Sequence, residues 1–211
     1  MKYILVALLA TSSVLAGCSS VGVGLRTGEE ALYSPLSVDG NFEIRSYEPI
    51  IVAQTAVSGS YSNATKLGYQ RLTDYVSGSN LARQTVSVND PVQVLEGQKA
   101  PKIDLTLPYY EEYIDGTWVV SVAMPEAYTL ETLPKPLNNS ITFKILPNLK
   151  VATVRYTGFK SEASVSKKTN LLKDWMSRNN LIAASAPRSV VYDSPLTVPV
   201  LRRNEIHISL K

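Results

Sequence analysis

The sequence has very little of the two side chains that most often carry chemistry. Its 211 residues include one cysteine, Cys18, and one histidine, His207. A single cysteine excludes an intrachain disulfide, and a serine–histidine–aspartate triad would depend on His207 alone. The sequence also lacks HExxH and CxxC motifs, a nucleophile elbow and a phosphate-binding glycine loop. These absences predict a protein that is not an enzyme and has no metal-binding motif.

Bilayer-spanning apolar runs and a strong charge of one sign are absent as well. The apolar run near the N-terminus, Tyr3–Ala10, is shorter than the roughly 20 residues that cross a bilayer core. The chain has 21 lysines and arginines against 18 acidic residues, with no basic run. Nucleic acid is therefore not an expected partner.

The first seventeen residues have the pattern of a secretory signal, with Lys2 ahead of the apolar run. They end in Leu15–Cys18, the residues Leu-Ala-Gly-Cys, which resemble the bacterial lipobox. The resemblance implies cleavage before Cys18, lipid on its thiol and, because Ser19 follows, sorting to the outer membrane. An ordinary secretory signal with a chance cysteine is the alternative. Acyl chains contribute roughly 0.8 kcal/mol per buried methylene, so two or three of them would anchor the protein stably.

Three regions are predicted along the chain. Residues 1–17 are a signal peptide, and residues 18–40 are the lipidated cysteine followed by a flexible tether, because they are rich in small residues and weakly patterned. Residues 41–211 form one domain, which is long enough to bury its own core.

Apolar periodicity predicts the elements of this domain. Alternating residues predict strands at Phe42–Tyr47 and Ile50–Val57, and spacings of three and four predict a helix capped by Asn63 and ending near Gly78. The tyrosine-rich and acidic segment Gly97–Asp115 is predicted to be a long loop or an irregular hairpin. The remaining predicted elements are strands at Val86–Val94, Thr117–Met124, Ile141–Ile145, Val151–Tyr156, Val190–Tyr192 and Glu205–Leu210, and a helix at Ser164–Asn179.

The two halves of the domain resemble each other. Val52-Ala53 lies 99 residues before Val151-Ala152, and each pair is followed by a glycine turn, a helix and an Asn-Leu pair. The matched order predicts an internal duplication. Two such units predict a single α+β domain with a curved antiparallel sheet or open barrel.

Several segments resemble the SOUL heme-binding protein family, across nearly all of residues 41–211. They are Phe42–Pro49, Tyr128–Pro136, Val151–Gly158 and, with the most specific pattern, Tyr192–Ile206. The resemblance implies a distorted antiparallel β-barrel of about eight strands flanked by two helices. It also implies binding of heme or another tetrapyrrole. The chain departs from the family at 87–92, where only Pro-Val remains of a Met-Thr-Ala-Pro-Val segment.

The candidate ligand-binding residues are His207, Lys66, Tyr69 and Arg71. Heme sites normally combine an axial ligand, an apolar cleft and cations for the propionates. His207 alternates with isoleucines and is expected to point outward, so the alternative to axial ligation is a strand histidine without a ligand role. Lys66, Tyr69 and Arg71 lie off or beside the core stripe of the first helix. They form either the rim of an apolar groove or simply a solvated face.

A second candidate is the basic and acidic run at Arg202-Arg203 and Glu205. Arginine offers a planar fork that binds carboxylates in two places. The run is interpreted either as a clamp for an anionic ligand or as a structural salt bridge that closes the barrel.

The sequence thus predicts an outer-membrane lipoprotein that faces the periplasm and binds heme, another tetrapyrrole or another hydrophobic planar ligand. Its partners are the membrane, through lipid on Cys18, and this small molecule. The alternative is an envelope interaction module whose groove is filled by side chains and whose contact surface is the segment 97–115. A third possibility is an enzyme that acts on a tetrapyrrole or a small lipid.

Overall fold

The computed structural model describes residues 29–82, 101–104, 106–193 and 197–211. Its helices are α1 (Tyr61–Val76) and α2 (Glu162–Arg178), and a short 3-10 helix lies at Pro199–Leu201. The strands of the main sheet are β2 (Tyr33–Asp39), β3 (Phe42–Tyr47), β4 (Ile50–Val57), β7 (Tyr109–Ile114), β8 (Thr117–Ala123), β10 (Ile141–Leu146), β11 (Leu149–Tyr156), β12 (Arg188–Val191) and β13 (Asn204–Ser209). Two small pairs join β1 (Glu29–Glu30) to β6 (Thr106–Leu107) and β5 (Asn80–Leu81) to β9 (Lys135–Pro136).

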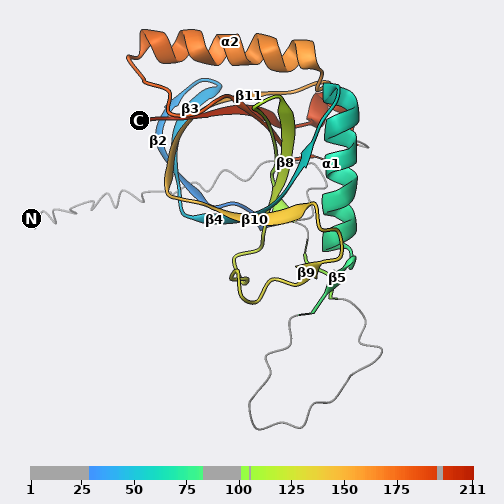
Figure 1. Ribbon diagram of the computed structural model, residues 1–211. Coiled ribbons are helices and arrows are strands. Elements are labelled where there is room, and N and C mark those ends of the chain that lie inside the picture. The colour runs from blue at the N-terminus through green and yellow to red at the C-terminus, as the bar shows by residue number, and fades with distance from the viewer. Residues whose placement is uncertain (1–28, 83–100, 105, 194–196) are drawn as a thin grey trace, which may run out of the picture.

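Within these residues, nine strands form one antiparallel sheet in the order β10-β4-β8-β7-β12-β13-β11-β3-β2. The sheet curls into an open half-barrel, and both helices lie against its outer face (Figure 1). The α+β class with two flanking helices, predicted from the sequence, is confirmed. Cys18 and the strand predicted at 86–94 lie outside the described residues.

The outer face of the sheet carries the apolar core. Helix α1 packs on β4 and β8 through fully buried Leu72 and Tyr75. Helix α2 packs on β11 and β13, where Trp175 and Met176 contact the cluster that contains Ile206. Because side chains alternate across a strand, the other residues of each strand face the inside of the curl.

Both helices begin two or three residues before their predicted starts, α1 at Tyr61 and α2 at Glu162. Ser60, not Asn63, is the N-cap of α1, and Asn63 lies exposed in the first turn. Helix α2 begins after Ser161, whose side chain accepts a hydrogen bond from the Ser164 backbone N–H while the Ser164 hydroxyl accepts one from the Ser161 N–H. This reciprocal capping box fixes the start of α2.

The two halves of the sheet pair their strands in equivalent registers. Val52 of β4 lies opposite Lys144 of β10, and Val151 of β11 lies opposite Arg45 of β3. Val52 precedes Val151 by 99 residues, and Arg45 precedes Lys144 by the same number. This is the offset found in the sequence, but an equivalent register does not show how it arose. The internal duplication stays a prediction.

The segment Gly97–Asp115, predicted to be a loop or irregular hairpin, contributes a central strand. Its residues 109–114 form β7, paired with β8 on one side and β12 on the other. Tyr109 and Tyr110 are buried, and the turn to β8 uses Asp115 and Gly116 with φ of 48° and 80°. Two positive φ angles are typical of a tight hairpin turn. Residues 109–114 are therefore an integral part of the sheet and not a loop.

Residues 29–39, which fall in the predicted tether, form β1 and β2. Strand β2 adds to the edge of the sheet beside β3, with Tyr33 opposite Tyr47. Most of β2 is exposed, so its sequence lacks the alternation that marks a half-buried strand. Tertiary pairing, rather than an apolar pattern, holds this segment in place.

Candidate functional site

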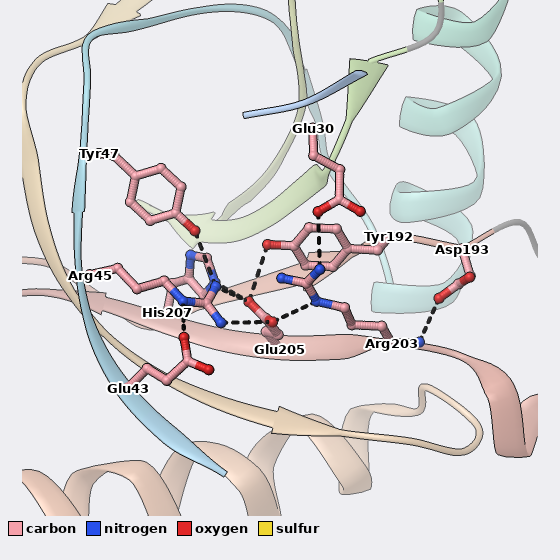
Figure 2. Close-up of polar contacts among 9 residues, drawn as sticks. All are labelled: Glu30, Glu43, Arg45, Tyr47, Tyr192, Asp193, Arg203, Glu205 and His207. Carbon is pink, nitrogen blue, oxygen red and sulfur yellow. Dashed lines mark hydrogen bonds and ion pairs between the residues drawn. The ribbon is translucent and has the colours of Figure 1, made fainter. Parts of the chain in front are cut away.

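A network of charged side chains lies inside the curl of the sheet and meets at Glu205 of β13. Figure 2 shows the network on the side of β13 that faces away from α2. Glu205, Arg45 and His207 have exposed fractions of 0%, 1% and 4%. Buried charges are rare unless they are paired and hydrogen-bonded. Buried charges thus lie on the inner face of the half-barrel, whereas Ile206 and Ile208 of the same strand pack in the cluster under α2.

The Glu205 carboxylate accepts hydrogen bonds from four side chains. Arg45 donates through both terminal nitrogens, at 2.7 and 3.1 Å, in the bidentate geometry of strong pairs. Arg203 Nε lies 2.8 Å and the Tyr192 hydroxyl 3.1 Å from the carboxylate oxygens. His207 Nε2 lies 2.7 Å from Oε2. With so many donors, the carboxylate of Glu205 is fully satisfied within the protein.

The network extends to the edges of the half-barrel through the two arginines. Arg45 Nε donates to Glu43 at 2.7 Å, and its Nη1 donates to the Tyr47 hydroxyl at 3.2 Å. Arg203 Nη1 donates to Glu30 of β1 at 3.0 Å. The N-terminal strand of the described chain is therefore tied to the interior of the fold.

Electrostatics fix the protonation states at the centre of the network. Burial by itself raises the pKa of Glu205, but hydrogen bonds from His207 and Arg45 outweigh burial and hold that pKa well below its ordinary value. Burial lowers the pKa of His207, against the opposing pull of Glu205. An ionised carboxylate only accepts hydrogen bonds, so neutral His207 carries its proton on Nε2 and donates it to Glu205.

The position of His207 corrects one expectation from the sequence. His207 lies on the face of β13 opposite Ile206 and Ile208, as the alternation predicted, but that face is the buried interior and not the solvent. Its ring lies 5.9 Å from Tyr47 and 6.5 Å from Tyr110, centroid to centroid. The ring nitrogen that bonds Glu205 is committed, so this histidine is not available to a ligand at the surface.

The arginine and glutamate run near the C-terminus is divided between two environments. Arg203 pairs with Glu205 inside the half-barrel, in agreement with the structural salt bridge rather than the anion clamp. Arg202 instead donates to the Thr197 carbonyl at 2.7 Å and lies over the ring of Phe159. The two arginines therefore do not form one fork.

The three candidates on α1 are not brought together either. Lys66 is exposed on the side of α1 that faces away from the sheet. Tyr69 lies on one flank, with its ring 4.8 Å from that of Tyr109. Arg71 lies on the other flank, where it donates to Thr55 at 3.1 Å. Lys66 and Tyr69 are neighbours three residues apart on the helix surface, whereas Arg71 belongs to the contact between helix and sheet.

A second polar cluster, which the sequence did not predict, surrounds Glu111 of β7 on the outer face. The Glu111 side chain is 0% exposed and forms an ion pair with Lys160, from the loop before α2. Tyr61, at the start of α1, donates to Glu111 at 2.9 Å, and Lys160 donates to the Tyr69 hydroxyl at 3.4 Å. The available signal was the period of two that places Tyr109, Glu111 and Tyr113 on one face, but the segment was interpreted as a long loop or an irregular hairpin.

A pocket of about 170 Å³ lies beside β1, with Leu32, Ile50, Met124 and Tyr128 in its lining. Pockets that enclose small-molecule ligands usually measure about 300–1,000 Å³. This pocket is below that range and contains none of the four predicted ligand-binding residues. In the described part of the chain, no group of three or more His, Cys, Asp or Glu side chains could hold a metal ion.

Comparisons with known proteins agree with the fold. The family model described as SOUL heme-binding protein matches residues 28–209. Heme-binding protein 1 of Xenopus laevis is 26% identical over 185 residues, which cover 87% of this chain and 91% of the relative. Among solved structures, the C-terminal domain of EcmrR has a TM-score of 0.52 at 14% identity, covering 85% of this chain and 98% of that one. A hydrolase from Listeria innocua has a TM-score of 0.51 at 11% identity, with 83% and 94% covered. At these identities the two structures show the fold alone.

Proposed function

Because the chain belongs to the SOUL heme-binding protein family, we propose that its domain binds heme or another tetrapyrrole. The observation that carries this proposal is the family match, which spans residues 28–209 and so includes both helices and the whole sheet. The name of the Xenopus laevis relative, heme-binding protein 1, supports the same ligand class.

The histidine and the two methionines among the described residues are not placed to ligate an iron. His207 is buried and bonded to Glu205, and Met124 and Met176 are only 5% and 3% exposed. Burial raises the pKa of Tyr69 well above its ordinary value, and the nearby Glu111 carboxylate adds to this, so a phenolate ligand is disfavoured there. The proposal is therefore a tetrapyrrole held by apolar contact and by pairing of its carboxylates with cations, without a protein ligand to the metal.

The exposed flank of α1 offers such contacts. Lys66 places an ammonium group in solvent. Tyr69 extends the same surface toward β7. Lys66 can pair with a carboxylate at the edge of the macrocycle, while Tyr69 provides aromatic area. Arg71, engaged with Thr55, is left out of this site.

Parallel titrations of fragment 19–211 with hemin and with metal-free protoporphyrin IX test the proposal. Because no protein group is expected to ligate the iron, the two dissociation constants should agree within about threefold. His207→Gln should leave both unchanged. Lys66→Ala should weaken the affinities for both compounds by about threefold, the effect of one exposed ion pair. Lys173→Ala, at an exposed position of α2, should leave both affinities unchanged.

Two outcomes would contradict this proposal. The absence of saturable binding by either compound would remove the ligand class. Binding of hemin alone, lost in His207→Gln, would mean that the interior histidine reaches the iron after all.

We further propose that lipid on Cys18 holds the domain at the outer membrane, facing the periplasm. Cys18 lies outside the described residues, and the support for this anchor is the lipobox pattern of Leu15–Cys18. No helix in the described part of the chain is long and apolar enough to cross a membrane. The wild-type chain should incorporate a palmitate analogue and fractionate with outer membranes, and Cys18→Ser should do neither. Unchanged labelling of Cys18→Ser would overturn the anchor.

Binding rather than catalysis is part of the same proposal. The one histidine donates to Glu205 in the barrel interior and has no serine or cysteine bonded to it among the described residues. The alternative function, an envelope interaction module, assigned its contact surface to the segment 97–115. Residues 109–114 of that segment form a central strand, which makes this part of the surface integral to the sheet.

A further inference from the structure

The cluster around Glu111 contains a buried carboxylate in an aromatic surrounding. Rings of Tyr61 and Tyr69 lie beside it, and the ring of Trp118 is 4.9 Å from that of Tyr61. The Lys160 nitrogen lies 5.6 Å and 5.1 Å from the centroids of Tyr61 and Tyr69. Aromatic faces within about 6 Å attract cations, and a buried carboxylate adds the opposite charge. This is the chemistry of a site that binds an organic cation.

Two buried hydroxyl groups near this carboxylate are only loosely paired, since the Ser189 hydroxyl lies near those of Tyr61 and Tyr156 without a hydrogen bond of ordinary geometry. They are the Tyr156 hydroxyl and the Ser189 Oγ, on residues that are 7% and 4% exposed. Ser189 lies directly opposite Glu111 in the pairing of β12 with β7. Buried polar groups are nearly always well paired, so loosely paired ones beside a charge can accept a further hydrogen-bonding group. A ligand ammonium with several N–H donors would provide such a group.

Lys160 is able to leave the cluster. It lies in the loop between β11 and α2, two residues after Gly158, whose φ of 103° is accessible to few other residues. Its neighbour Phe159 is 73% exposed, and its own side chain is 17% exposed. A lysine head group on a flexible stem can turn toward solvent, where it is well hydrated.

We propose that Glu111, Tyr61, Tyr69 and Trp118 form a binding site for a small organic cation with a flat apolar group, and that Lys160 is its resident occupant. A protonated amine takes the place of the Lys160 ammonium on Glu111, and its apolar group packs against the rings. Burial beside the carboxylate raises the pKa of Tyr61 and Tyr69 well above the ordinary value, so both phenols stay neutral donors and acceptors. This ligand class is opposite in charge to the carboxylates of a tetrapyrrole, so the inference does not rest on the proposed function.

The experiment titrates the full chain in a non-ionic detergent with benzylammonium and with neutral benzyl alcohol, following the fluorescence of Trp118 in a Trp175→Phe background. Removing the competitor in Lys160→Ala should tighten benzylammonium binding at least about tenfold relative to wild type. Benzyl alcohol should not bind, and Lys173→Ala should behave as wild type. Glu111→Gln in the Lys160→Ala background should abolish binding, and Tyr69→Leu there should weaken it about fivefold.

Three results would overturn the inference. Benzylammonium binding no tighter to Lys160→Ala than to wild type is the first, and equal binding after Glu111→Gln is the second. Because Lys160→Ala leaves Glu111 buried without its cation, the variant can be unstable. In that case benzylammonium must raise the melting temperature of the variant in a saturable way. The third overturning result is an equal rise of the melting temperature with benzyl alcohol.

Discussion

Replacing Glu205 with glutamine should lower the free energy of unfolding by about 3–5 kcal/mol at neutral pH. Glutamine has nearly the same size as glutamate, so the change removes charge without opening a cavity. Arg45 and Arg203, with side chains 1% and 8% exposed, would then remain buried without the carboxylate that they share. Urea denaturation of the two proteins, followed by circular dichroism, measures the difference.

Glu43→Gln provides the matched control for this variant. Glu43 bonds the same arginine at 2.7 Å, but its side chain is 22% exposed and water can replace the lost charge. Its removal should cost less than about 1 kcal/mol. Equal losses for Glu43→Gln and Glu205→Gln would mean that Glu205 is not the anion that compensates the interior arginines.

Replacing Gly68 with alanine should destabilise the protein by about 1–3 kcal/mol, although alanine in a helix is usually preferred to glycine by nearly 1 kcal/mol. The sign reverses because of Val120 on β8. An added Cβ would lie 2.5 Å from one Val120 methyl carbon and 2.7 Å from its Cβ, so α1 would have to move off the sheet. Thermal and urea denaturation measure the change.

The second variant, Val120→Ala, separates this clash from a general effect of the substitution. Val120→Ala alone leaves a cavity and should cost about 1–3 kcal/mol. Combined with Gly68→Ala, this change removes the Val120 methyl carbon at 2.5 Å but keeps the Cβ at 2.7 Å, so it relieves only part of the clash. The double variant should still be at least about 1 kcal/mol more stable than additivity predicts. Additive losses would contradict the direct contact. Asn63→Ala, at an exposed position of the same helix, should change stability by less than about 0.5 kcal/mol.

The sequence was informative where one face of a strand is apolar and the other is polar. Alternation located β3 and β4 correctly, and the interpretation of β13 placed Ile206 and Ile208 on the core side. It failed for β7, because Tyr110 faces a polar interior and Glu111 lies under the helices, so neither face has an apolar pattern. Both residues are buried by tertiary contacts that no local window contains.

The candidate site was predicted less well, for two geometric reasons. His207 was placed on the correct face of its strand, but a sheet that curls has an interior on that face as well, and only the closed fold reveals it. Tyr69 and Arg71 are both beside the core stripe of α1, yet they lie on opposite flanks. The pairing of Arg45 with Glu205 spans 160 positions and has no sequence signal at all.

The link between Glu30 and Arg203 has a mechanical consequence. Chain that precedes Glu29 joins the domain at β1, which is held by parallel pairing with β6 and by the ion pair to the interior. A pull on the N-terminus therefore loads the side chains at the centre of the half-barrel and not a surface loop. Force on β1 would be resisted by the same charges that stabilise the fold, so detachment of β1 and loss of the folded state would be coupled events.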